Sequence, residues 1–202
     1  MDNYYKSYSK RKDIEKYAYH FAHFIQKKYF KVKGNLLDIG CGAGYYMKAF
    51  KEMGYEVYGL DNDKEALKIS SQFGNVRNID LSKKFQFPFP NEFFDVVFAK
   101  SIIEHSYNPR RFIKELRRIL KPEGIAYIQT PNHNTKRSQK GFYSDPTHLS
   151  PLTFKETQSL LLDFEIIEFK KYKSFPYIWR FTDMAFKING FWIDDVFVVV
   201  KK

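Results

Sequence analysis

The sequence has very little cysteine and no long apolar run. Cys41 is the only cysteine among 202 residues, so neither an intrachain disulfide nor a cysteine-rich metal site can form, and we expect no metal ion. A membrane-spanning helix needs about 18 or more apolar residues in succession, and no such stretch is present. The first residues also lack the apolar segment of a signal peptide. These absences predict a protein of a reducing compartment, the cytoplasm.

The composition is that of one folded domain with a basic surface. Hydrophobic residues make up 44% of the chain and aromatic residues 19%, which is enough for a substantial core, and we expect a single domain over residues 1–202. The formal charge is +11, but the lysines are spread along the chain in short clusters such as Lys10-Arg11-Lys12. This spread favours ordinary surface charge over a site for a polyanion such as nucleic acid.

Apolar strands and amphipathic helices alternate along the chain. Periodicity predicts helices over about residues 10–30, 44–53, 63–74, 108–120 and 153–162, and strands over about 36–39, 55–61, 95–99, 125–130, 164–169 and 197–200. Two helix starts carry capping signals, Asn108 before Pro109 and Thr153 with Glu156. Short buried strands separated by amphipathic helices predict an α/β fold, a three-layer sheet with helices on both faces.

The most informative segment runs from Leu36 to Gly44, with the sequence LLDIGCGAG. An apolar strand leads into a turn with glycine at every second position, and glycine lets the backbone adopt positive φ and approach a ligand closely. The following helix, expected to begin at about Ala43, points free N–H groups at that ligand. A dinucleotide-binding loop would place its third glycine where Tyr45 stands. The spacing therefore disfavours NAD and FAD.

This pattern resembles motif I of the class I S-adenosylmethionine (SAM)-dependent methyltransferases, in which a strand and an acidic residue precede G-x-G-x-G. The match is complete at Asp38, Gly40, Gly42 and Gly44, and the resemblance covers roughly residues 34–170. It implies a Rossmann-like sheet of seven strands, mostly parallel, with one antiparallel strand near the C-terminus. It also implies SAM as cofactor and S-adenosylhomocysteine (SAH) as product.

The resemblance further implies the residues that hold the cofactor. Asp61, at the end of the second strand, matches the carboxylate that takes the two ribose hydroxyls, and Asp80 matches the acidic residue beside the adenine amino group. Asp38 acts on the methionine end, either directly or through the loop or a water molecule. The full set of expected cofactor residues is Asp38, Gly40, Cys41, Gly42, Gly44, Asp61, Asn62, Asp80, Leu81 and Ala99.

His105 and His148 are the candidate proton acceptors, because imidazole titrates near neutral pH. His148 ends the run Asp145-Pro146-Thr147-His148, at the end of a long polar loop that begins at Pro131. This run resembles a segment of methyltransferases of glycan and cell-surface polysaccharide assembly and of relatives of the ubiquinone O-methyltransferases. The alternative is structural: His105 lies beside the cofactor without taking a proton, and His148 satisfies a backbone carbonyl.

The expected function is methyl transfer to a small-molecule or glycan acceptor, at oxygen. One alternative is RNA methylation, and another is a SAM-binding scaffold without turnover. Cytosine C5 methylation needs a cysteine outside the cofactor loop, and the Asp/Asn-Pro-Pro-aromatic motif that grips a base amino group is missing. Residues 1–33 are expected to form a helical lid, and residues 174–193 an aromatic insertion that covers the acceptor, pairs two subunits as a homodimer, contacts a lipid-linked substrate or packs on its own domain.

Overall fold

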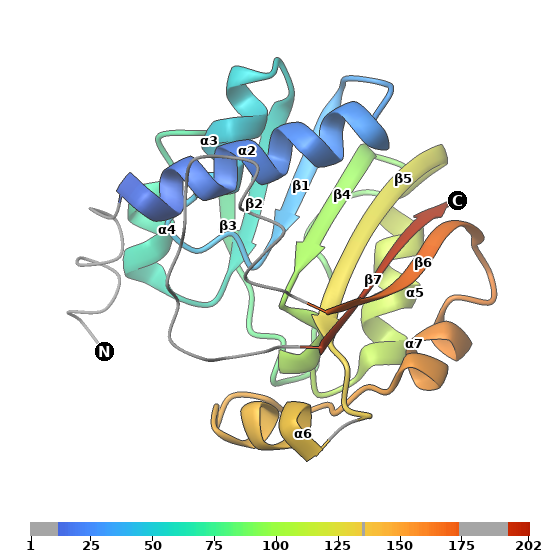
Figure 1. The fold of residues 1–202 in the computed structure, drawn as a ribbon. Coiled ribbons are helices and arrows are strands. Elements are labelled where there is room, and N and C mark those ends of the chain that lie inside the picture. Colours follow the sequence, from blue (N-terminus) through green and yellow to red (C-terminus); the bar gives the residue numbers. More distant parts are fainter. Residues whose placement is uncertain (1–11, 135, 174–193) are drawn as a thin grey trace.

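The computed structural model describes residues 12–134, 136–173 and 194–202. Their strands form one seven-stranded sheet in the order β3-β2-β1-β4-β5-β7-β6 (Figure 1). Neighbouring strands from β3 to β5 pair parallel, whereas β7 pairs antiparallel with both β5 and β6. The predicted seven strands and the late antiparallel strand are confirmed. The strands are β1 (Asn35–Ile39), β2 (Glu56–Asp61), β3 (Asn75–Asn78), β4 (Phe94–Lys100), β5 (Leu120–Pro131), β6 (Glu165–Lys173) and β7 (Asp194–Lys201).

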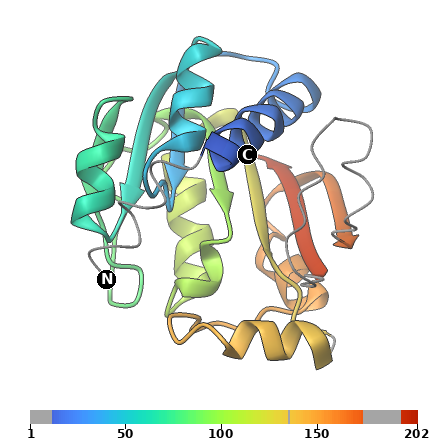
Figure 2. The ribbon, with the colours of Figure 1, turned by 60° about the vertical axis from the view of Figure 1, so that its left-hand side comes forward.

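The order of the strands explains where a ligand can bind. Chain order reverses at β1, since β2 and β3 lie on one side of it and β4 and β5 on the other. In open parallel sheets, the crevice at such a reversal opens beyond the carboxyl ends of the strands. The arrowheads of β1 and β4 point to the same edge of the sheet, and the helix α6 lies beyond that edge in both views (Figures 1 and 2).

Successive residues of each strand point to opposite faces, and both faces carry a buried apolar cluster. Leu36 and Phe98 belong to a cluster that includes Ile25 of α2 and Phe50 of α3. Leu37 belongs to the other cluster, which includes side chains of α5. Burial on both faces explains the continuous apolar runs of the central strands. The helices are α2 (Lys12–Lys28), α3 (Tyr45–Glu52), α4 (Lys64–Ser70), the 3-10 turn η1 (Ile103–His105), α5 (Pro109–Ile119), α6 (Lys136–Tyr143) and α7 (Phe154–Leu160).

The predicted helix starts at residues 108 and 153 are confirmed. Asn108 caps α5 by accepting a hydrogen bond from the Arg111 N–H at 2.9 Å. Thr153 and Glu156 form the reciprocal capping box of α7. These bonds satisfy backbone N–H groups that a helix start would otherwise leave without partners.

Two boundaries differ from the prediction. The loop expected from Pro131 to His148 contains the helix α6, because burial of Phe142 stabilises residues whose own sequence shows no apolar period. Strand β5 begins at Leu120 rather than at Ile125, since Leu120 pairs with Phe94 before an irregularity restores the register. Parts of the expected lid and the expected insertion, residues 1–11 and 174–193, lie outside the described residues.

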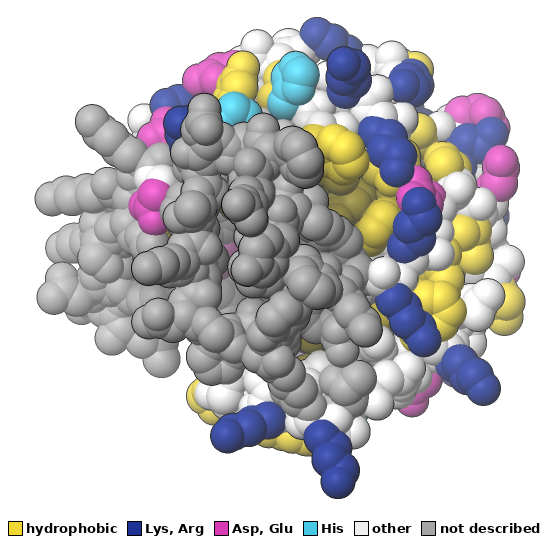
Figure 3. Space-filling model, in the orientation of Figure 1, with side chains coloured by type: hydrophobic (Ala, Val, Ile, Leu, Met, Phe, Trp, Pro, Cys, Tyr) yellow, Lys and Arg dark blue, Asp and Glu magenta, His cyan; other side chains and the backbone are white. Residues whose placement is uncertain are grey.

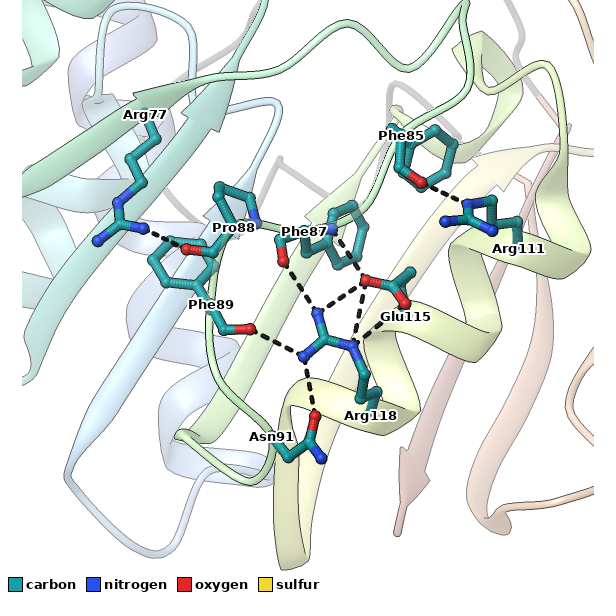
Figure 4. Close-up of polar contacts among 9 residues, drawn as sticks. All are labelled: Arg77, Phe85, Phe87, Pro88, Phe89, Asn91, Arg111, Glu115 and Arg118. Atoms are coloured by element: carbon teal, nitrogen blue, oxygen red, sulfur yellow. Dashed lines mark hydrogen bonds and ion pairs between the residues drawn. The ribbon is translucent and has the colours of Figure 1, made fainter.

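An arginine of α5 holds the segment that leads from β3 to β4 (Figure 4). The Arg118 guanidinium donates to the carbonyl oxygens of Phe87 and Phe89 at 2.9 and 2.8 Å, and to Asn91 Oδ1 at 3.0 Å. Its ion pair with Glu115 is 2.8 Å long, and Glu115 also accepts from the Phe87 N–H. The segment has no strand or helix of its own, so these contacts replace regular backbone bonding.

Candidate functional site

A cavity of about 700 Å³ lies at the carboxyl ends of β1, β2 and β4, where the chain order reverses. Its walls come from α2, the glycine loop after β1, the segments after β2, β3 and β4, and the residues that follow α6. The lining residues are Ile14, Tyr17, Ala18, Ile39, Gly40, Cys41, Gly42, Ala43, Tyr45, Tyr46, Leu60, Asp61, Asn62, Asp63, Ile79, Asp80, Leu81, Ser82, Lys100, Ser101, Ile102, His105, Pro146, Thr147 and Leu149.

The glycine loop adopts a backbone that other residues would strain. Gly40, Gly42 and Gly44 have φ of 79°, 50° and 81°. At Gly44 a Cβ would lie 3.0 Å from the Cα of Ser70, and at Gly40 it would lie 2.8 Å from Ile102. Gly44 caps α3, which begins at Tyr45, so the helix starts two residues later than the sequence predicted. The loop therefore needs glycine both for its φ angles and for close packing.

Asp61 joins the loop to the end of β2. Its Oδ2 accepts a hydrogen bond from the Gly42 N–H at 2.8 Å, and its Oδ1 accepts from the Asp63 N–H at 2.9 Å. Each carboxylate oxygen has a second lone pair, so the side chain can still accept from a ligand diol in the cavity. Asn62, another of the expected cofactor residues, also lines the cavity.

Asp38 lies behind the loop rather than in the cavity wall. It is 2% exposed, and its Oδ2 has no hydrogen-bond partner. Burial, followed by the charge of Asp61, raises the pKa of Asp38 to about 8, against the opposing effect of Lys100. The sequence left open whether Asp38 acts on the methionine end directly or through the loop or a water molecule. Its position suits the indirect role.

Asp80 and Leu81 follow β3 and line the cavity opposite the glycine loop. The Lys83 ammonium is 2.8 Å from Asp80 Oδ2, and Ser82 donates to Asp80 Oδ1. The hydrogen bond from Lys83, followed by that from Ser82, lowers the pKa of Asp80. The carboxylate is therefore ionised and is held in one orientation beside the cavity.

His105 lines the cavity at the end of η1. Its Nδ1 lies 3.2 Å from the Thr147 carbonyl oxygen and 3.0 Å from Thr147 Oγ1. A carbonyl can only accept, so the contact assigns the proton to Nδ1 and leaves a lone pair on Nε2. Burial, followed by the neighbouring His148, lowers the pKa of His105. The ring is thus a neutral base next to the cavity.

His148 stands behind His105, with 4.7 Å between the ring centroids, and is not among the described residues that line the cavity. Its Nδ1 donates to the Phe142 carbonyl at 2.8 Å, which matches the structural alternative drawn from the sequence. The buried Glu104 is next to both rings, and one ligand atom of each of the three side chains lies within 4.8 Å of the others. A divalent cation could bridge such a set, which the sequence did not lead us to expect.

The structure brings most predicted residues into one cavity and leaves four outside its wall. Asp38, Gly44, Ala99 and His148 do not line the cavity, although Gly44 shapes the loop. Three lining residues that sequence reasoning missed are Tyr17, Lys100 and Thr147. The apolar period of α2 could have indicated Tyr17, and the position of Lys100 directly after an apolar strand could have indicated a side chain at the binding edge.

Lys100 is the only lysine or arginine among the described residues that line the cavity. Burial lowers its pKa, against the raising effect of Asp195, Glu104 and Asp38. On the part of the face in Figure 3 that is not grey, Lys and Arg side chains are spread over the surface, some of them next to Asp or Glu. This distribution agrees with the expected solvated surface charge.

Comparisons with known proteins identify relatives of this chain. Residues 37–128 match the family model of the methyltransferase domain. Over 130 residues the chain is 29% identical to a probable S-adenosylmethionine-dependent methyltransferase of Mycobacterium tuberculosis, and this match covers 64% of this chain and 47% of that protein. Over 113 residues it is 34% identical to the ubiquinone biosynthesis O-methyltransferase of Rhodopseudomonas palustris, covering 50% of this chain and 41% of that protein.

A solved structure matches over nearly the whole length of both chains. The crystal structure of a SAM-dependent methyltransferase from Archaeoglobus fulgidus has a TM-score of 0.65 and 25% sequence identity, and the match covers 92% of this chain and 94% of that chain. The two relatives matched by sequence are longer, and the chain spans less than half of each.

Proposed function

We propose that the chain is a SAM-dependent methyltransferase and that it transfers a methyl group from SAM to the oxygen of a small-molecule or glycan acceptor. The observation that carries the proposal is the continuity of the cavity. The same space is lined by the glycine loop and Asp61 and also by His105 and Thr147. A cofactor and an acceptor could therefore bind side by side in one cavity.

The residues present fit SAM. The glycines that line the cavity let a ligand approach the backbone of the loop closely, and Asp61 retains free lone pairs for the two ribose hydroxyls. Asp80 and Leu81 line the cavity, which supports their proposed contact with the adenine, and Asp38 has an unpartnered oxygen behind the loop. When bound, SAM would supply a methyl group made electrophilic by its sulfonium sulfur.

The acceptor would lie against Ser101, His105 and the turn that carries Thr147. For transfer to a hydroxyl, the hydroxyl proton has to leave as the new bond forms. His105 can take it at Nε2, because Thr147 holds the ring with its proton on Nδ1. Otherwise the protein acts by aligning the acceptor and excluding water. Ile14, Tyr17 and Ala18 of α2 line the cavity, which supports the proposed lid function of residues 1–33.

Calorimetry followed by a turnover screen tests the proposal. The protein is titrated with SAM and SAH, and acceptor panels are then assayed with an SAH hydrolase-coupled readout. We expect both ligands to bind and turnover with a hydroxylated small molecule or glycan. Binding without turnover on any acceptor would favour the scaffold alternative, and binding of a pyridine dinucleotide in place of SAM would contradict the family function.

Two histidine variants test the proton acceptor. His105→Ala should lose most turnover while SAH affinity is retained, because the ring takes the proton rather than holding the cofactor. His148→Ala tests the second candidate: a loss of turnover at unchanged SAH affinity would assign it a catalytic contribution, and undiminished turnover would limit it to packing. The two rings are in contact, so the double variant shows whether their effects are additive.

RNA methylation remains a second candidate, because the charge of +11 favours polyanions. It predicts RNA binding that weakens steeply with salt, and SAM-dependent labelling of RNA. The spread of Lys and Arg side chains over the coloured part of the surface in Figure 3 favours the small acceptor. A salt-independent result without labelling would remove the RNA candidate.

A further inference from the structure

Lys100 is a charged side chain at the floor of the cavity that the proposed reaction does not use. It is the last residue of β4 and pairs with Gln129 of β5. Its Nζ lies 5.9 Å from the ring centroid of Phe21 on α2. The side chain therefore lies on the α2 face of the sheet and borders the cavity together with Tyr17 of the same helix.

The Lys100 ammonium has no direct acidic partner in the described part of the chain. Within residues 12–134, 136–173 and 194–202, no carboxylate oxygen lies within 4.0 Å of its Nζ, and no hydrogen bond from it is present. Asp195, Glu104 and Asp38 act on it only through longer-range electrostatics. A partly buried cation without a direct partner is costly, so a ligand anion in the cavity would be favoured at this position.

The proposed cofactor carries one anionic group, the α-carboxylate of its methionine portion, next to an α-ammonium. The other acidic or basic side chains among Asp, Glu, His, Lys and Arg that line the described cavity are three aspartates and His105, and none of these is a permanent cation. Asp38 pairs with Phe98, two residues before Lys100, so Asp38 and Lys100 point to the same face from neighbouring strands. A carboxyl group and an ammonium group thus lie on the same face of neighbouring strands, an arrangement that suits a zwitterionic ligand.

We infer that the Lys100 ammonium binds the α-carboxylate of the cofactor's methionine portion. This inference rests on the proposed function, since it takes SAM as the ligand. Lys100 is accordingly a binding residue that sets the preference for a cofactor with a complete amino-acid end. The unpartnered oxygen of the buried Asp38 can accept a hydrogen bond from the α-ammonium from behind the loop.

The test compares two ligands and three proteins by isothermal titration calorimetry. The ligands are SAH and its decarboxylated analogue, in which a propylamine replaces the amino-acid end. The proteins are wild type, Lys100→Met and Lys114→Met, a matched loss of one charge at an exposed position of α5. Wild type should bind SAH about 10- to 100-fold more tightly than the analogue, the range of a charge-assisted hydrogen bond. Lys100→Met should remove this preference by weakening SAH alone, and Lys114→Met should keep it.

Each result decides the inference. Equal affinity of wild type for SAH and the decarboxylated analogue would overturn the inference. This comparison needs no variant, so it decides the inference even if Lys100→Met does not fold. Unchanged SAH affinity in folded Lys100→Met would also overturn it and would assign the lysine to an anionic acceptor. Lys100→Arg keeps the cation and should keep a preference for SAH. If wild type binds neither ligand, the proposed function itself fails, and this outcome is distinct from the others.

Discussion

Asp61 is the side chain that joins the glycine loop to the second strand, through bonds from the N–H groups of Gly42 and Asp63. Asp61→Ala removes the acceptors for the ribose hydroxyls and releases the loop. We expect SAM affinity to fall by about 1.5–3 kcal/mol, the range for hydrogen bonds to a charged group. Calorimetric titration of SAM into the variant measures the loss.

Asp163→Ala provides the matched control, since it removes the same charge from an exposed turn before β6. It should bind SAM as wild type does. Wild-type affinity in Asp61→Ala would displace Asp61 from the ribose site.

Asp38 makes stability depend on pH. Its pKa is about 8 in the folded protein, raised mainly by burial, and about 3.9 in an unfolded chain. Between these values the folded state binds more protons than the unfolded state, so the contribution of Asp38 is complete below about pH 4 and is lost as pH rises toward 8. Asp38→Asn cannot ionise, and its free energy of unfolding should exceed that of wild type by a margin that grows from pH 5 to pH 8, reaching roughly 1–3 kcal/mol.

Urea denaturation at pH 5, 6, 7 and 8 measures this margin. Asp163→Asn, at an exposed position, should differ from wild type by the same small amount at every pH. A pH-independent difference between Asp38→Asn and wild type would show that the buried carboxyl is ionised throughout, with Lys100 as its counter-charge.

At the scale of single elements, α5 holds the irregular segment between β3 and β4 through Arg118. Arg118→Met leaves the carbonyl oxygens of Phe87 and Phe89 and the Glu115 carboxylate without this donor. The guanidinium is partly exposed, so we expect a loss of about 2 kcal/mol in the free energy of unfolding rather than the sum of its bonds. Urea denaturation monitored by circular dichroism measures it.

Arg110→Met changes the same charge on the same helix at an exposed position and should cost much less. Arg118→Lys keeps the charge but cannot bond both carbonyls and Asn91 together, so its loss should be intermediate. Equal stability of Arg118→Met and Arg110→Met would mean that the apolar contacts of the phenylalanines alone hold the segment.

The elements predicted from sequence are those whose signals are local. The caps at Asn108 and Thr153 and the glycine loop depend on residues within a few positions of each other, and the structure has the caps and the positive φ angles that these signals predict. Helix α6 was missed because its stability comes from burial of Phe142 beside His133 and His148, which are close only in the folded chain. The Arg118 bonds likewise depend on how α5 lies across the segment.

The same distinction applies to the candidate site. Asp61 ends β2, Asp80 follows β3 and His105 ends the turn after β4, so a motif and its spacing bring them together at the carboxyl edge of the sheet. Tyr17 reaches the cavity only because α2 crosses that face, and no local pattern encodes the crossing. Whether His148 faces the cavity depended on the fold of residues 131–148, and the helix in that segment turns its Nδ1 to the Phe142 carbonyl.

At the scale of the whole molecule, the basic charge is partly balanced by acidic partners. Lys28 and Lys170 flank Glu168, and Lys121 pairs with Asp95 at 2.8 Å. The hydrogen bonds from Lys170 and Lys28, followed by that from Tyr29, lower the pKa of Glu168 to about 2. Exposed pairs of this kind contribute little to stability, so the core clusters on the two sheet faces hold the molecule together. Within the described ranges, no helix has the length and apolar character needed to cross a bilayer.

Ligand binding should stabilise the whole domain, because the cavity joins the glycine loop, the ends of three strands and α2. A ligand at 100 times its dissociation constant adds about 2.7 kcal/mol to the free energy of unfolding, which for a chain of this size raises the melting temperature by about 5–10 °C. We expect this rise with SAH in a calorimetric melt, and none with NAD at the same concentration. Asp61→Ala should show a smaller rise than Asp163→Ala at equal SAH concentration. A rise with NAD and none with SAH would mean that the glycine loop binds a phosphate-bearing coenzyme.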